Sequence, residues 1–273
     1  MNWEEAVSEL RNTPGKEYLV KEAYLETSLI NNIERFRNSE EYKQTISEIR
    51  KITNQKSGTL LDIGAGNGIS SIAFALDGYT VTALEPDDSK LVGAGAIEFC
   101  KQYFKLDSVT IIQTFAETLP FDDNSFDIVY GRQVMHHAYE LNLFVSQAYR
   151  VLKKGGIFMT TRDHVIKNEA DKQVFLDRHP LHKLYGGENA FRLEEYRNAM
   201  LKSGFEIRNT IGPSDSPINY DPWNKQRLKN LIASKFGSFF GNNSLIINVA
   251  WRVNLIRLNK IAGRVYSFIC VKS

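Results

Sequence analysis

The sequence has few cysteines and no long apolar run, and each shortage excludes a class of protein. Its two cysteines, Cys100 and Cys270, lie far apart in apolar surroundings. They cannot form a disulfide framework or a zinc cluster, so we expect buried free thiols in a reducing compartment. No apolar run reaches the about 18 residues of a membrane-spanning helix, and residues 1–10 lack the basic and apolar regions of a secretory signal. We therefore expect a cytoplasmic protein.

The chain also has little net charge, although its charges are unevenly distributed. Lysine and arginine total 34 against 32 aspartates and glutamates, a net charge of +2. This balance gives no reason to expect a nucleic-acid partner. Residues 216–273, however, contain nine bases and one acid, a local charge of +8 that leaves −6 for the rest. This asymmetry requires an explanation.

A glycine-rich turn within residues 60–69 (LLDIGAGNGI) is the most informative stretch. Residues 59–63 form a short apolar run typical of a buried parallel strand, and residues 69–76 begin like a helix. Three alternating glycines lie between them: Gly64, Gly66 and Gly68. Backbone N–H groups can approach a ligand closely at such a turn.

The residues around the turn distinguish between two kinds of ligand. A dinucleotide-binding turn has the pattern G-x-G-x-x-G, but Ile69 occupies the position of the third glycine. Asp62 precedes the turn. A carboxylate there would repel a pyrophosphate and would attract the ammonium of an amino-acid moiety.

The turn resembles the cofactor motif of the class I S-adenosylmethionine (SAM)-dependent methyltransferases, in particular the methyltransferase domain 11-like group that includes quinone-biosynthesis and small-molecule enzymes. The resemblance covers residues 57–211 and the last strand, and implies SAM as cofactor and S-adenosylhomocysteine (SAH) as product. Glu85, after a predicted strand, would accept hydrogen bonds from the ribose diol. Relatives have an aspartate where this chain has Phe115, so we expect Phe115 to pack on the adenine. The cofactor contacts expected in all are Asp62, Gly64, Ala65, Gly66, Asn67, Gly68, Glu85, Pro86, Phe115, Ala116, Glu117, Arg132 and His137.

The apolar runs predict the strands of an α/β protein: residues 59–63, 79–84, 108–113, 125–130, 157–161, 205–211 and 265–271. We predict a Rossmann-like, doubly wound seven-stranded sheet, and the resemblance implies that its last strand is antiparallel. Residues 57–273 would form the methyltransferase domain, with a helical insertion at about 213–263. Residues 1–56 would be helical, either covering one sheet face or forming a lid with Tyr18, Tyr24 or Arg35 touching the ligand.

Histidines near two strand ends are candidates for acid–base catalysis. His136 and His137 are adjacent, so on a helix they would point about 100° apart and at most one would face the site. Adjacent histidines seldom bind one ion and no acid or cysteine cluster accompanies them, so we expect no metal. The resemblance gives His137 a packing role beside the cofactor, which leaves His136 as a general-base candidate. His164 is the second candidate, with a structural role as the alternative.

Recognition of the acceptor should fall to loops at the same sheet edge. Residues 179–191 (HPLHKLYGGENAF) are predicted to form such a loop before a helix at 192–203, and a preceding helix is predicted to end on the Lys-Lys-Gly-Gly segment at 153–156. The substrate contacts that we predict are Arg162, His182, Tyr185, Glu188 and Tyr18. For the residues of the loop, stabilisation of the loop itself is the alternative role.

The basic insertion permits three interpretations. Its helices, predicted at 223–236 and 244–262, could form a cap buried against the core, the lid or a second subunit; a basic patch for an acidic acceptor; or a membrane-surface element. The polar residues of the second helix do not gather on one arc, as those of a membrane-surface helix would. We expect the buried cap, with a homodimer through the helical caps as an option and no membrane association.

Together these features predict a SAM-dependent methyltransferase that moves a methyl group to an O or N atom of a small-molecule acceptor, including sugar- or phosphate-bearing ones, by in-line displacement. The chain lacks the Asn/Asp-Pro-Pro-aromatic and Pro-Cys segments that the family uses for amide and cytosine chemistry. Two alternatives remain: an NAD-dependent oxidoreductase and a non-catalytic SAM-fold binding module.

Overall fold

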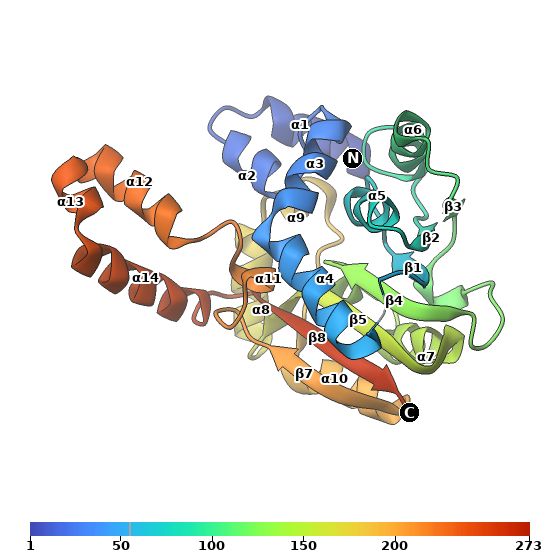
Figure 1. Cartoon of the computed structure of the whole chain (residues 1–273). Coiled ribbons are helices and arrows are strands. Elements are labelled where there is room, and N and C mark those ends of the chain that lie inside the picture. Colours follow the sequence, from blue (N-terminus) through green and yellow to red (C-terminus); the bar gives the residue numbers. More distant parts are fainter. Residues whose placement is uncertain (55) are drawn as a thin grey trace.

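The short apolar runs of the sequence form one mixed sheet with helices on both faces (Figure 1). The computed structural model describes residues 1–54 and 56–273; residue 55, part of the predicted N-terminal cap, lies outside the described residues. The strands are β1 Thr59–Ile63, β2 Thr80–Leu84, β3 Val109–Ile112, β4 Phe126–Arg132, β5 Leu152–Ile166, β6 Phe191–Arg192, β7 Phe205–Ile211 and β8 Arg264–Lys272.

The strand order is that of a doubly wound sheet. It runs β3-β2-β1-β4-β5-β8-β7, and β6 pairs with β5 outside this path. β8 is antiparallel to β5 and β7, and the other pairings are parallel. The predicted sheet with its antiparallel last strand is confirmed, and the two-residue β6 is an eighth strand that the sequence pattern did not predict.

Two hydrophobic cores cover the two faces of the sheet. The helices are α1 Trp3–Asn12, α2 Glu17–Glu22, α3 Leu29–Asn38, α4 Glu40–Thr53, α5 Ile69–Leu76, α6 Ala94–Phe104, η1 Ala116–Thr118, η2 Met135–His137, α7 Leu141–Val151, α8 Glu169–Arg178, α9 Pro180–Tyr185, α10 Leu193–Lys202, α11 Pro217–Tyr220, α12 Lys225–Phe236, α13 Ser238–Asn242 and α14 Ser244–Leu258. On one face α3 to α6 contribute side chains such as Phe36 and Phe74. On the other, α7 and α10 contribute Phe144 and Tyr196. Cys100 and Cys270 are buried free thiols, as predicted.

Two local predictions are wrong. α7 ends at Val151, and the Lys-Lys-Gly-Gly segment that was expected to end this helix lies in β5. A side chain on Gly156 would lie 2.8 Å from the carbonyl oxygen of Asp127, so the glycine allows β5 to approach β4 where their register shifts. Residues 179–191 are not a continuous loop, because they contain α9 and the start of β6. His179 accepts a hydrogen bond from the His182 backbone and Pro180 follows, a helix start that the sequence pattern contains.

The basic insertion forms an arm that projects from the body of the molecule (Figure 1). Its base is held where Arg162 donates hydrogen bonds to the carbonyls of Ile218, Asn219 and Asp221. Further out, Phe239 and Leu245 are 76% and 71% exposed. Burial of this helical pair against the core of its own chain is therefore a wrong expectation.

Within residues 1–54 and 56–273, no helix combines the length and the apolar character that crossing a membrane requires.

Candidate active site

The glycine turn joins β1 to α5 in a left-handed conformation. Gly64, Gly66 and Gly68 have φ angles of 64°, 54° and 84°. Gly68 is the N-cap residue of α5, and no side chain caps this helix. The first N–H groups of α5 therefore have no side-chain partner there and can bind a ligand.

Two of these glycines should respond differently to the same substitution. A Cβ on Gly64 would overlap Val134, whereas a Cβ on Gly66 meets no atom within 4 Å. We expect Gly64→Ala to destabilise the fold by both overlap and backbone strain, and Gly66→Ala to cost only about 1–2 kcal/mol for the left-handed backbone. Gly66→Ala should instead weaken SAH binding, because its methyl group occupies the open space. Thermal unfolding and calorimetry with SAH would test this, and equal losses of stability in the two variants would contradict it.

Two carboxylates beside the turn fit a SAM-like ligand. Asp62 is fully buried. Its Oδ2 accepts hydrogen bonds from Ser70 and Ser71 at 2.7 and 2.5 Å, but its Oδ1 has no partner among the described residues. Burial raises the pKa of Asp62 to about 6. A buried, unpartnered carboxylate oxygen matches the ammonium of an amino-acid moiety.

Glu85 lies at the end of the adjacent strand, where a ribose was expected. Its Oε2 accepts a hydrogen bond from the backbone of Gly66 at 2.7 Å, and its Oε1 accepts one from Asp87 at 3.0 Å. Burial raises the pKa of Glu85 to about 7, although these two hydrogen bonds oppose the shift. Each oxygen keeps a lone pair for a ribose hydroxyl.

An aromatic pair flanks the predicted adenine segment. Phe115 is 51% exposed and meets Tyr139 edge to face at 6.1 Å. Glu117 in η1 accepts a hydrogen bond from the backbone of Tyr139, while Ala116 is buried and Pro86 is exposed. Tyr139, which is 82% exposed, was not among the predicted contacts, and its aromatic side chain on a polar segment was the available signal.

Arg132, a predicted cofactor contact, instead forms an ion pair with a carboxylate of α4. Its Nε and Nη2 donate to the two oxygens of Glu41 at 2.6 and 3.1 Å. Burial acts to lower the pKa of Arg132, but the Glu41 charge and hydrogen bonds outweigh it and raise the pKa. Arg162 approaches the same carboxylate at 3.5 Å. Glu41 was missed because nothing in the helical pattern of α4 marks a partner so distant in sequence.

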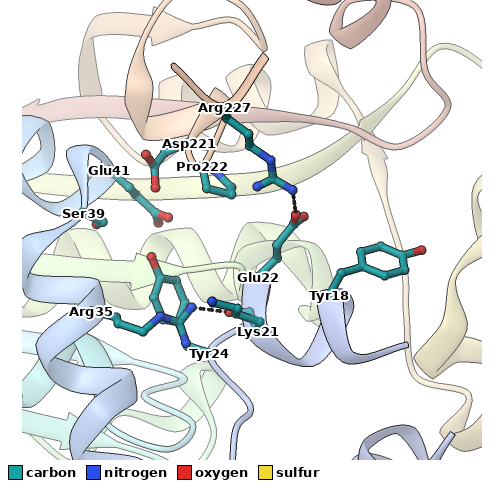
Figure 2. A pocket seen from close by; sticks show the side chains of 10 residues that line it. All are labelled: Tyr18, Lys21, Glu22, Tyr24, Arg35, Ser39, Glu41, Asp221, Pro222 and Arg227. Carbon is teal, nitrogen blue, oxygen red and sulfur yellow. Dashed lines mark hydrogen bonds and ion pairs between the residues drawn. The ribbon is translucent and has the colours of Figure 1, made fainter. Parts of the chain in front are cut away.

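A cavity of ≈ 400 Å³ lies between the N-terminal helices and the base of the arm (Figure 2). Its lining residues are Tyr18, Lys21, Glu22, Tyr24, Arg35, Ser39, Glu41, Asp221, Pro222 and Arg227. They include the three residues considered for a lid, Tyr18, Tyr24 and Arg35. Arg227 of α12 pairs with Glu22 of α2 across the cavity. The backbone oxygen of Tyr24 accepts a hydrogen bond from Asn67 at 2.8 Å, so one lining residue of the cavity is bonded directly to the glycine turn.

The histidines gather at the ends of β4 and β5. His136 is buried, and Oδ1 of Asp163 lies 3.1 Å from both its backbone N and its Nδ1. Burial acts to lower the pKa of His136, but the hydrogen bond to Asp163 and the nearby carboxylate of Glu188 raise it to about 9. The rings of His136 and His137 lie 4.1 Å apart in the η2 turn, and both approach Glu188. The prediction that the side chains of His136 and His137 point apart, with at most one facing the site, is therefore wrong.

His164, the second catalytic candidate, faces the same group. Its Nδ1 lies 2.6 Å from the carbonyl oxygen of Gly263 and so donates a hydrogen bond to it. Burial and the His136 charge lower the pKa of His164 to about 3, so its ring is neutral at pH 7.

The predicted acceptor residues lie in separate places. Glu188 lies among the histidines, and Tyr18 lines the cavity. Tyr185 contacts Trp3 of α1 with ring centroids 5.7 Å apart. His182 lies in α9, and its Nδ1 is buried without a partner among the described residues.

Sequence comparisons place this fold among methyltransferases. A family model described as a methyltransferase domain matches residues 61–160. An uncharacterized methyltransferase of Bacillus subtilis, YcgJ, is 31% identical over 172 residues, covering 61% of this chain and 64% of the relative. A ubiquinone biosynthesis O-methyltransferase of Rhizobium leguminosarum is 29% identical over 170 residues, covering 60% and 65%. The chain thus spans just under two thirds of the length of these relatives.

Solved structures agree at the level of the fold. The [4+2]-cyclase SpnF superposes with a TM-score of 0.59 at 20% identity, covering 93% of this chain and 95% of that one. A geranyl diphosphate C-methyltransferase from Streptomyces coelicolor, solved with SAH and Mg²⁺, superposes with a TM-score of 0.60 at 14% identity. The match covers 85% of this chain and 76% of that one. The segment matched by the family model runs from β1 into β5 and contains the glycine turn, so over residues 61–160 the chain is similar to the methyltransferase domain of class I SAM-dependent enzymes.

Proposed function

We propose that the protein transfers a methyl group from SAM to an oxygen or nitrogen atom of a small-molecule acceptor. The observation that carries this proposal is the pairing of two buried carboxylates, Asp62 and Glu85, on either side of an uncapped helix N-terminus. When bound, SAM supplies a methyl group already activated by the sulfonium charge. Asp62 would hold the amino group, Glu85 the ribose, and Phe115 with Tyr139 the adenine.

The cavity, whose lining residue Tyr24 is hydrogen-bonded to the glycine turn, is the proposed acceptor site. Its volume of ≈ 400 Å³ is in the range of small-molecule pockets. Most of its lining residues carry polar or charged groups. Arg35 and Arg227 are paired with Glu26 and Glu22, whereas Lys21 forms no ion pair with another described residue. These features support a polar acceptor with an anionic group, such as a phosphate or a carboxylate. The N-terminal helices would align the acceptor and exclude water, which accounts for much of the catalysis in such a transfer.

A hydroxyl acceptor must also lose a proton. The His164 ring is neutral, and its Nδ1 proton is held by Gly263, so its Nε2 keeps a lone pair. His136 has a raised pKa and is protonated at pH 7, so its role would be to orient and balance charge.

Histidine substitutions should affect turnover and not cofactor binding. We expect His136→Ala and His164→Ala to lower turnover by at least about tenfold, because each removes a group that handles or positions a proton. SAH affinity should stay near that of the wild type. If both variants kept full activity, the acceptor would be an amine or an already ionised group and no base would be needed.

The function itself is tested in two steps. Calorimetry with SAM, SAH and NAD should show binding of the first two only; binding of NAD alone would favour the oxidoreductase. Incubation with methyl-labelled SAM and panels of small metabolites, nucleotide sugars and phosphorylated compounds should then transfer label. Tight SAM binding without transfer to any panel would favour a binding module.

A further inference from the structure

The histidine cluster contains a feature that the proposed methyl transfer does not explain. All five histidines of the sequence fall between residues 136 and 182. Three of them place a ring nitrogen within 3.6–3.8 Å of the Glu188 carboxylate: His136, His137 and His179. A fourth, His164, joins His136 and Glu188 in a set whose ligand atoms all lie within 4.8 Å of one another. We propose that His136, His164 and Glu188 bind a divalent transition-metal ion, with Zn²⁺ as the first candidate.

The ligand atoms are close to the spacing that an ion requires. Bonds of about 2.1 Å in tetrahedral geometry put ligand atoms about 3.4 Å apart. Nε2 of His136 already lies 3.6 Å from Oε2 of Glu188. The remaining separation, at most 4.8 Å, would close with a small movement of side chains. Two imidazoles and one carboxylate favour Zn²⁺ or Fe²⁺ over Mg²⁺ and Ca²⁺, and leave coordination positions for water or a substrate oxygen.

The groups behind the two histidines fix the orientation of each ring. Asp163 holds Nδ1 of His136 at 3.1 Å, and the carbonyl of Gly263 holds Nδ1 of His164 at 2.6 Å. Both rings therefore keep Nε2 free for the ion. Metal-binding histidines almost always have such a carboxylate or carbonyl behind them. Gly263 has a φ angle of 64°, and a side chain there would overlap Phe175, so the position of its carbonyl depends on glycine.

The charge balance of the cluster also favours a cation. Asp163 is fully buried and Glu188 nearly so, and Oδ2 of Asp163 has no partner among the described residues. Two carboxylates buried close together bring an excess of negative charge into a low-dielectric interior, where it is costly without a cation. A doubly charged ion would remove that excess. His137, beside Glu188, has 40% of its side chain exposed, so the cluster reaches the protein surface.

The sequence analysis predicted no metal, because adjacent histidines seldom bind one ion and no acid or cysteine cluster accompanied them in the sequence. The first reason still applies to the pair, since only His136 is a proposed ligand. The second does not hold in the structure, which brings Asp163 and Glu188 beside the histidines. The other ligands come from the end of β5 and from the segment before β6, and no fixed spacing connects them. The proposal rests on this geometry and not on the proposed methyl transfer, although an ion would occupy the same His164 nitrogen.

Metal binding can be measured without any acceptor. The chain, purified without a histidine tag and stripped with a chelator, would be titrated with Zn²⁺ against a chromophoric chelator and with Co²⁺ by visible absorption. We expect one equivalent to bind. X-ray absorption of the zinc-loaded protein should show two imidazoles with oxygen ligands. Failure to bind a stoichiometric ion, or a spectrum with a different number of imidazoles, would overturn the proposal without any variant.

Variants provide the matched comparison. Glu188→Gln and His164→Gln should weaken Zn²⁺ binding by about 100-fold or more, and Asp163→Asn by about 10–100-fold through the orientation of His136. His182→Gln, which changes a nearby histidine outside the ligand set, should bind Zn²⁺ like the wild type. SAH binding by each variant reports on folding and tests the cofactor site separately. Equal zinc affinity in Glu188→Gln and His182→Gln would contradict the site.

Discussion

Replacing Glu41 by alanine is expected to lower the free energy of unfolding by about 3–5 kcal/mol. The Glu41 side chain is only 2% exposed and binds Arg132 through two hydrogen bonds, with Arg162 at 3.5 Å. Removing it leaves two arginines facing each other without their shared anion. The Arg132 guanidinium also lies 5.5 Å from the ring centre of Tyr24, so the cavity wall should loosen. Urea unfolding followed by circular dichroism would measure the loss.

The neighbouring residue supplies the control. Glu40 begins the same helix and pairs with Lys43 at 2.8 Å, but the two side chains are 59% and 55% exposed. Exposed pairs of this kind contribute about 0.2–1 kcal/mol. Glu40→Ala should therefore be nearly neutral. If Glu41→Ala lowered the free energy of unfolding no more than Glu40→Ala, the buried contacts of Glu41 with the two arginines would contribute little to stability.

Replacing Glu85 by alanine is expected to weaken SAM binding by about 100-fold. A hydrogen bond to a charged acceptor contributes about 1.5–3 kcal/mol, and about 1.4 kcal/mol corresponds to tenfold in affinity. Glu85 would accept one hydrogen bond from each of the two ribose hydroxyls, and losing both accounts for this decrease in affinity. Calorimetry with SAH would measure it, with Glu40→Ala as the comparison, because Glu40 is an exposed acid of α4 that pairs with Lys43. Similar losses in the two variants would argue against a ribose at Glu85.

The same carboxylate should make nucleoside binding depend on pH. Because burial raises the pKa of Glu85 to about 7 in the empty protein, its carboxyl is mostly protonated at pH 6 and ionised at pH 8. A ligand that needs the ionised form should bind about tenfold more weakly at pH 6 than at pH 8. 5′-Methylthioadenosine is the suitable probe, since it has the ribose but lacks the amino-acid group that titrates in SAM. If the affinity of Glu85→Gln for 5′-methylthioadenosine depended on pH in the same way, the pH dependence would belong to another titrating group.

The cofactor side could be predicted from sequence because its signals are local. Three glycines and two strand-end carboxylates fall within residues 62–85, and each position follows from the strand that precedes it. Burial of Glu41 could not be predicted, because an acid in the first turn of an amphipathic helix is ordinarily solvated. The ligand set of His136, His164 and Glu188 is equally hidden, since three separate segments meet only after β5 and β6 have paired.

The arm was predicted as helical, but its exposure away from the core of its own chain could not be predicted, for a related reason. The spacing of apolar residues along a helix predicts which face is buried only when these residues form one stripe. In α14 they surround the helix, and Val253 and Ile256 are exposed while Asn254 is buried. A helix without a dominant face carries no information about which neighbour it packs against.

The position of β8 has a consequence for the order in which the protein folds. β8 lies between β5 and β7, yet it follows β7 in the chain only after the whole arm. On the ribosome, β7 therefore emerges without its neighbour, and the edge of β5 that β8 will cover stays open until residue 272 has left the exit tunnel. Unpaired strand edges are prone to wrong pairing. The part of the sheet from β3 to β5, which carries the glycine turn, can form first. The β8 and β7 part must form later, and with it the hydrogen bond from His164 to Gly263 that completes the histidine cluster.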